Sequence, residues 1–318
     1  MSEKEYRSPL LVVFGPTGAG KSGLGLALAE RFGGEIVNCD SVQVYRGLDI
    51  GSAKVPEASR RGIPHHLIDI AEPQEDVTAG AYSRLARQAL YAIRDKGRIP
   101  VVVGGTGLYL RALLDGLSPA PQRNEELRTR LQRMVGRRPD SLHRFLKRYD
   151  PDAANRIHAN DHQKLIRAVE LTLLGGQPAT AIQSIPRTPL KGFRVLKIGL
   201  SPERKALYRQ IDARAAGMFD EGLIDETRAL LNAGVSPQAK ALQSLGYRQA
   251  LNVLAETMTI KDAVTECQTK TRQYAKRQLT WFRREADVHW LDGFGSDEAL
   301  KRAAAELSGS FIAHRETG

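Results

Sequence analysis

The stretch GPTGAGKS at residues 15–22 restricts the fold of this chain more than any other part of its sequence. It has the GxxxxGK[ST] spacing of a P-loop, and it lies between the apolar run LLVVF and the helix-like segment KSGLGLALAERF. Glycines let successive N–H groups point at an anion, Lys21 adds a positive charge, and Ser22 can ligate Mg²⁺. The motif therefore predicts a strand, a loop and a helix, with phosphate held by Gly15, Pro16, Thr17, Gly18, Ala19, Gly20, Lys21 and Ser22. ATP is the usual ligand of such a loop.

Strand-like and helix-like segments alternate along much of the remaining chain. Between the second and third expected strands, apolar residues recur every three or four positions from Tyr82 to Ile93, which is typical of a helix that covers a sheet. This alternation predicts an α/β fold, a P-loop NTPase-like parallel sheet with helices on both faces. The expected strands are residues 10–14, 35–40, 98–105, 193–200 and 288–291.

Residues 122–185 break this alternation, because they are charged and helix-like and contain no convincing strand pattern. They indicate an inserted helical domain. We therefore expect an α/β core formed by residues 1–116 and 195–318, and a helical insertion at 117–194.

The charge balance points toward a polyanionic partner. The 318 residues include 47 Lys and Arg against 36 Asp and Glu, a formal charge of +11, and the pI is about 9.7. No apolar run is long enough for a signal peptide core or a membrane span, so a cytoplasmic protein without membrane association is expected. Two cysteines exclude a disulfide framework and a Cys-rich metal site.

Asp40 ends the second expected strand, at the sheet edge where open α/β folds bind their ligands. It therefore faces the predicted phosphate site. Two roles remain open from its position alone: a carboxylate that ligates Mg²⁺ through water or caps a helix, and a general base.

Thr106 and Arg214 have similar pairs of interpretations. Thr106 follows the strand at 98–105, so its hydroxyl either caps the next helix or contributes to the site. Arg214 lies off the apolar stripe of its helix-like segment, and it is either solvated or an anion clamp. His158 and His162 have helical i, i+4 spacing, but no third ligand completes a metal motif and nearby cations disfavour one.

The run KTRQYAKRQLTWFRRE at residues 270–285 is strongly basic. On a helical projection, Arg272, Lys276, Arg277, Arg283 and Arg284 share one arc, and aromatic and aliphatic residues occupy the other. A solvated amphipathic face is the ordinary interpretation of such a pattern. The density of cations favours a phosphate backbone as the partner.

Taken together, these segments resemble the tRNA dimethylallyltransferase (IPP transferase) family over nearly the whole chain. The resemblance rests on GPTGAGKS, DSVQVYRGLDIGSAK, HHLIDI, VVVGGTGLYLRALLDGL, HANDHQKLIRAVEL, LYRQIDAR, GLIDE, QSLGYRQAL and TRQYAKRQLTWFRRE. Two positions depart from the common pattern: Gly18-Ala19 replaces the more usual Ala-Ser, and Lys164 stands where Arg is commoner.

The resemblance implies that the loop holds the diphosphate of dimethylallyl diphosphate, and that Mg²⁺ is bound partly by Ser22. The implied reaction transfers the dimethylallyl group to N6 of adenosine 37 in tRNAs that read codons beginning with U, giving N6-(dimethylallyl)adenosine. Diphosphate is released. The implied catalytic residues are Asp40, Thr106, Lys21 and Arg214, and a monomer is expected.

The same resemblance implies that the catalytic core has tRNA-binding helices near its C-terminal end and that the helical insertion at 117–194 also contacts tRNA. The implied contacts lie in six parts of the chain. These are Asp40, Ser41, Val42, Gln43 and Thr106; Arg128; Gln163, Lys164, Leu165, Ile166 and Arg167; Gln243, Ser244, Leu245, Gly246, Tyr247 and Arg248; and Lys276, Arg277, Gln278, Leu279, Thr280, Trp281, Phe282 and Arg283. A P-loop kinase acting on a small molecule is the leading alternative, but it leaves the basic run unexplained. A nucleotide-gated RNA-binding protein is a third interpretation.

Overall fold

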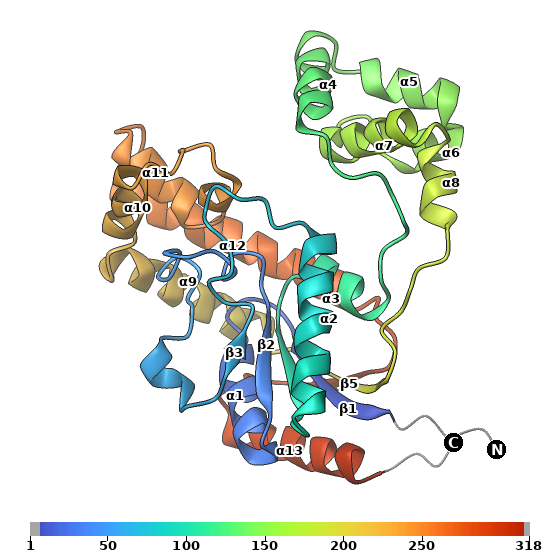
Figure 1. The fold of residues 1–318 in the computed structure, drawn as a ribbon. Coiled ribbons are helices and arrows are strands. Elements are labelled where there is room, and N and C mark those ends of the chain that lie inside the picture. Colours follow the sequence, from blue (N-terminus) through green and yellow to red (C-terminus); the bar gives the residue numbers. More distant parts are fainter. Residues whose placement is uncertain (1–6, 315–318) are drawn as a thin grey trace, which may run out of the picture. The chain divides into compact units, whose positions relative to one another are not determined.

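The computed structural model describes residues 7–314 (Figure 1). Two compact units are present. The first is formed by the chain up to Leu114 together with the chain from Leu190 onward, and the second is Asp115–Pro189. At the junction, Leu190 N donates a 2.7 Å hydrogen bond to Leu114 O, so the chain leaves and re-enters the first unit at adjacent residues.

The first unit is built on a six-stranded sheet with the order β3-β2-β4-β1-β5-β6, and all of its strand pairs are parallel. Its strands are β1 Ser8–Phe14, β2 Glu35–Cys39, β3 His65–His66, β4 Pro100–Gly104, β5 Phe193–Leu200 and β6 Val288–Leu291. The predicted α/β fold and its five predicted strands are confirmed. The short strand β3 was not predicted, since two residues carry no alternation pattern.

Helices cover both faces of this sheet, as predicted. Apolar residues of α1 Lys21–Phe32 and α13 Glu298–Ala313 pack with Leu11 and Val13 of β1 on one face. On the other face, Leu10 and Val12 pack in a core that includes residues of α2 Ala79–Asp95, α3 Gly107–Leu114 and α12 Ile260–Phe282. Alternate residues of one central strand therefore enter two different cores, which requires a continuously apolar strand.

Three further helices, α9 Arg204–Asp220, α10 Leu223–Asn232 and α11 Tyr247–Leu254, belong to the same unit, with the short 3₁₀ helices η1 Glu57–Arg60 and η2 Lys240–Gln243. α9 and α12 pack through Leu207, Ile211 and Ala275. Within residues 7–314, no helix is both long enough and apolar enough to cross a membrane.

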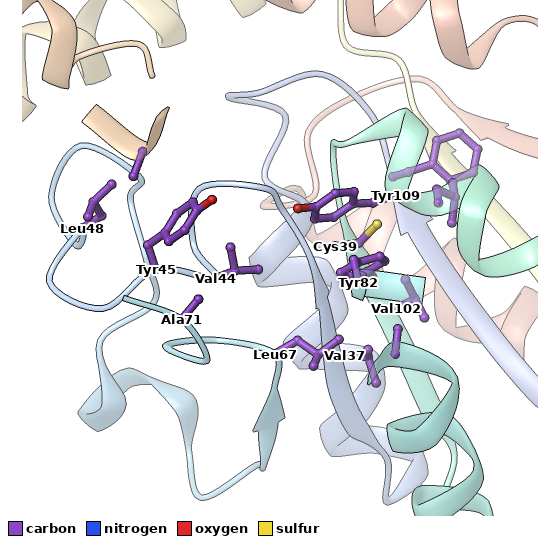
Figure 2. Packing of buried hydrophobic residues seen from close by; sticks show 14 of the residues in the cluster. Val37, Cys39, Val44, Tyr45, Leu48, Leu67, Ala71, Tyr82, Val102 and Tyr109 are labelled. Carbon is purple, nitrogen blue, oxygen red and sulfur yellow. The ribbon is translucent and has the colours of Figure 1, made fainter. Parts of the chain in front are cut away.

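The core at the carboxyl end of β2 is aromatic. Figure 2 shows Tyr82 and Tyr109 next to Cys39, and their rings stack with centroids 4.1 Å apart. Tyr82 donates to Asn38 O and Tyr109 donates to Val77 O, so neither buried hydroxyl lacks a partner. This packing fixes the end of β2, from which Asp40 emerges.

The second unit contains the helices α4 Glu125–Arg137, α5 Ser141–Tyr149, α6 Pro151–Arg156, α7 His162–Gly175 and α8 Ala179–Ser184, around a core that includes Leu131, Leu146 and Val169. A fully buried carboxylate, Glu170, lies between two arginines of this unit. It accepts from Arg128 Nε at 3.1 Å and from Arg167 Nη1 at 2.7 Å, and it also accepts from Asn124 N. These hydrogen bonds offset the cost of burying the charge.

Candidate active site

The predicted P-loop links β1 to α1. Gly18 and Gly20 have φ of 81° and 80°, in the left-handed region that side chains other than glycine rarely adopt. A Cβ added at Gly15 would lie 2.9 Å from Leu200 O of the neighbouring strand β5. The glycines therefore allow a loop whose first-turn N–H groups at α1 face outward from the carboxyl edge of the sheet.

Lys21 is the loop residue at which α1 begins, and its Nζ donates to Pro16 O at 2.8 Å. Burial of the ammonium lowers the pKa of Lys21 to about 8; the Asp40 charge opposes this shift, and the Arg214 charge adds to it. A cation whose charge is costly to bury gains from a bound anion, which supplies a counter-charge.

Arg214 reaches the same loop from α9. Its Nη1 donates to Thr17 Oγ1 at 3.2 Å, while its buried Nε has no hydrogen-bond partner among the described residues. Burial lowers the pKa of Arg214, and Asp40 opposes this effect. A buried N–H without a partner is uncommon, and here it points to an anionic ligand.

Asp40 and Thr106 follow the carboxyl ends of β2 and β4. Asp40 Oδ1 accepts from Val42 N at 2.8 Å and from Gln43 N at 3.4 Å, so it shapes the loop that follows. Thr106 precedes α3, yet its Oγ1 accepts from Ser41 N at 3.0 Å on the adjacent loop. The hydroxyl thus ties the two strand ends together.

The loop after Asp40 is held by hydrogen bonds and ion pairs of Lys54 that the sequence pattern did not predict. Lys54 is buried and donates to Tyr45 O at 3.0 Å and to Asp69 at 2.6 Å, and it also pairs with Asp49. The carboxylates of Asp49 and Asp69 are partly exposed, and they supply the counter-charge that the buried Lys54 ammonium requires.

A second anchor comes from α10. Glu226 of the GLIDE motif accepts from the backbone N–H groups of Asp49 and Ile50, and from the hydroxyl of Tyr247. Burial and the Glu226 charge both raise the pKa of Tyr247, so this hydroxyl keeps its proton and remains a donor. Two motifs far apart in sequence thereby fix one loop.

Two cavities of about 310 and about 100 Å³ adjoin at Thr17, Asp40, Ser52, Arg214 and Tyr274, which line both. The smaller one is polar and is also lined by Lys21 and Ser22. The larger one has an apolar wall that includes Ile211, Met218 and Leu245. The arrangement suits a ligand with an anionic end and an apolar end, and three of the four predicted catalytic residues line the cavities. Thr106 lines neither and acts on the site through Ser41.

The oxygen donors at this site fit Mg²⁺. Ser22 and Asp40 line the smaller cavity together. Among residues 7–314, no three His, Cys, Asp or Glu side chains are grouped so that they could hold a metal. His158 and His162 therefore belong to no such group. Mg²⁺ commonly binds through one or two protein oxygens and the phosphates of a substrate, so this sparse donor set is sufficient.

The basic run lies at the end of α12, which stops at Phe282, so Arg283 and Arg284 occupy the turn that follows. An exposed hollow of about 420 Å³ is lined by Gln273, Lys276, Arg277, Thr280, Trp281 and Arg284. Arg272, which the helical projection placed with the other cations, forms an ion pair with Asp212 of α9. It therefore stabilises helix packing.

The other residues implied as tRNA contacts are of three kinds. Exposed side chains include Gln163, Lys164, Gln243 and Arg248, of which Lys164 pairs with Asp161. Several members of the same ranges are buried, so their side chains support the surface and do not form it: Leu165, Ile166, Tyr247, Gln278 and Phe282. Arg128 and Arg167 are both paired with the buried Glu170.

Sequence reasoning did not assign Tyr274 of α12 to the site, and it placed Gln278 only among the tRNA contacts. Tyr274 lines both cavities, and burial together with the Asp40 charge raises its pKa. Gln278, one helical turn later, is also buried and reaches the P-loop. The available signal was their i, i+4 spacing on the apolar arc, where a glutamine is unexpected.

Comparison with known proteins agrees with this geometry. The profile of the IPP transferase family matches residues 43–285. A tRNA dimethylallyltransferase of Koribacter versatilis (strain Ellin345) is 54% identical over 299 residues, covering 94% of this chain and 97% of that protein. The crystal structure of a tRNA isopentenylpyrophosphate transferase from Bacillus halodurans is 36% identical, with a TM-score of 0.69, and covers 97% of this chain and 100% of its own.

A eukaryotic dimethylallyltransferase, described as acting on tRNA, is similar at a TM-score of 0.81 and 28% identity, over 97% of this chain and 80% of that one. The family profile spans most of this sequence, and the two bacterial relatives align with this chain almost from end to end. Similarity of this extent covers the P-loop, the loop after Asp40 and the basic helix alike. This chain therefore belongs to the IPP transferase family, the family of the tRNA dimethylallyltransferases.

Proposed function

We propose that this protein transfers the dimethylallyl group of dimethylallyl diphosphate to N6 of adenosine 37 in tRNAs that read codons beginning with U. The observation that carries the proposal is the meeting of two cavities at Asp40 and Arg214. One cavity contains the cations of a phosphate site, and the other has the apolar wall that a prenyl group needs. The curated relatives bear the name of this activity.

On the donor side, the bond between the allylic carbon and the diphosphate oxygen breaks, and negative charge builds on the leaving group. Lys21, Arg214 and the N–H groups of the loop stabilise that charge. Mg²⁺, which the Ser22 hydroxyl would hold, would supply further neutralisation of the diphosphate. The apolar wall of the larger cavity, which includes Met218, shields the allylic group from water.

On the acceptor side, the adenine amine is a weak nucleophile because its lone pair is delocalised into the ring. Asp40 takes the proton that N6 loses as the carbon–nitrogen bond forms, so diphosphate and a protonated Asp40 balance the reaction. The base has to leave the stack of the anticodon loop to reach this site. Ser41 and Thr106, which are hydrogen-bonded to each other, lie beside Asp40 and orient the adenine base.

Label transfer tests the proposal directly. The protein is incubated with dimethylallyl diphosphate labelled in the prenyl group, or with γ-labelled ATP, with and without unmodified tRNA. We expect label in tRNA from the prenyl donor only, and no turnover of ATP. Transfer of label from ATP to a small molecule would identify a kinase, and ATP hydrolysis without transfer would favour a nucleotide-gated binding protein.

The lowered pKa of Lys21 makes diphosphate binding sensitive to pH. The protonated ammonium binds the anion, so affinity is full below pH 8 and declines as the pH rises through about 8. Lys21→Arg serves as the control because a guanidinium stays charged. Between pH 7 and pH 9, the affinity for inorganic diphosphate in the native protein should fall about tenfold relative to Lys21→Arg, measured by calorimetry. Parallel pH curves for the two proteins would contradict this role.

A further inference from the structure

Gln278 lies where α12 meets the P-loop. Its side chain is 6% exposed. Oε1 accepts a 2.8 Å hydrogen bond from Thr17 N in the middle of the P-loop, and Nε2 donates a 2.8 Å hydrogen bond to Gly105 O at the end of β4. A Cβ added at Gly105 would lie 2.5 Å from Nε2, so the amide fits against bare backbone. One side chain thus joins the two loops that border the smaller cavity.

Thr17 is held from two helices at once. Gln278 of α12 binds its backbone N–H, and Arg214 of α9 binds its hydroxyl. The helices are themselves linked, because Arg272 pairs with Asp212 and Gln268 donates to Asp212 O at 3.1 Å. The conformation of the P-loop therefore depends on the position of α12 as well as on β1 and α1.

The side of α12 opposite Gln278 is exposed to solvent along the same helical turn. Lys276, Arg277 and Thr280 lie within two residues of Gln278 and line the exposed hollow of the basic run. A polyanion bound in this hollow would contact the helix that carries Gln278. The helix thus connects a surface suited to RNA with the loop suited to diphosphate.

We propose that Gln278 is a positioning residue that couples RNA binding on α12 to diphosphate binding in the P-loop, an inference that rests on the proposed function. Two polyanions on one small protein repel each other, so electrostatics alone would make each weaken the binding of the other. Coupling through Gln278 has the opposite sign. RNA holds α12 in place, α12 holds Thr17, and the N–H groups after Thr17 stay directed at the anion. Linkage requires the effect to be reciprocal.

The test is a set of binding measurements with inorganic diphosphate, Mg²⁺ and unmodified tRNA. In the native protein, diphosphate should bind about tenfold more tightly when tRNA is saturating, and tRNA should gain the same factor from diphosphate. Gln278→Met keeps the size of the side chain but removes both hydrogen bonds. In this variant, the ratio of diphosphate affinity with saturating tRNA to diphosphate affinity without tRNA should be close to one. Gln88→Met, an exposed glutamine on α2, is the matched control and should keep the native ratio.

Gln278→Glu replaces only the donor to Gly105, so it should also lower the ratio, and it provides the same test if the Met variant does not fold. A folded Gln278 variant with the native ratio would overturn the proposal, as would a native ratio of one. Because the measurements use binding alone, these failures are distinct from a failure of label transfer, which would instead overturn the proposed reaction. If Gln278 only supported the fold, its replacement would lower the diphosphate affinity equally with and without tRNA, and the ratio of the two affinities would not change.

Discussion

Asp40→Asn should slow prenyl transfer by about 10² to 10⁴ under single-turnover conditions, while tRNA and diphosphate affinities stay near native. Asparagine keeps the size of the side chain and one oxygen, so the hydrogen bonds that Oδ1 accepts from Val42 N and Gln43 N are retained. What is lost is the acceptor for the N6 proton. The rate is measured with labelled donor, saturating tRNA and a series of Mg²⁺ concentrations.

The Mg²⁺ series separates the two roles that Asp40 can have. If its carboxylate serves mainly as a metal ligand, diphosphate affinity falls together with the rate, and high Mg²⁺ restores part of the activity. A general base gives neither effect. Recovery of the rate of the Asp40→Asn variant at high Mg²⁺ would therefore rule out proton transfer as the main contribution of this residue.

Charge reversal on the exposed side of the basic run should produce the largest loss of tRNA affinity. The triple variant Lys276→Glu, Arg277→Glu and Arg284→Glu changes three cations that line one hollow. Each lost phosphate contact lowers the slope of log K against log salt by roughly 0.7 to 0.9, so the slope should fall by about two. At a salt concentration near 0.1 M this corresponds to about a hundredfold weaker binding.

The matched control reverses three exposed arginines elsewhere, Arg31, Arg84 and Arg302 on α1, α2 and α13. Both triple variants change the net charge equally, so a general electrostatic effect would act on both. We expect the control to retain most of the native slope. Equal slopes in the two variants would show that the hollow makes no specific phosphate contacts, and melting temperatures measured in parallel identify any loss of folding.

Those parts of the site that depend on local sequence could be predicted. The P-loop is set by the spacing of Gly15, Gly20 and Lys21, and the strand before it and the helix after it are visible as patterns. The position of Asp40 follows from the parallel sheet, whose strands end at one edge. Stereochemistry within a few residues is sufficient for each of these predictions.

Contacts between distant segments could not be predicted in this way. Arg272 has the same helical phase as Lys276, and only the packing of α9 against α12 shows that Asp212 neutralises it. Lys54 looks like an ordinary loop lysine until the fold brings Asp69 beside it. Gln278 is the clearest case, because its partners are 261 and 173 residues away in the chain. A periodicity argument identifies the buried side of a helix but not what lies against it.

The hydrogen bond between Leu190 N and Leu114 O has an evolutionary consequence. A chain that leaves and returns at one point behaves as a loop whose ends are already closed, and closure entropy rises only with the logarithm of loop length. Lengthening, shortening or replacing Asp115–Pro189 therefore costs the sheet little, since the register between β1 and β5 is set by neighbouring backbone pairs. Natural variants could thus exchange this entire segment while the machinery built around the P-loop stays unchanged.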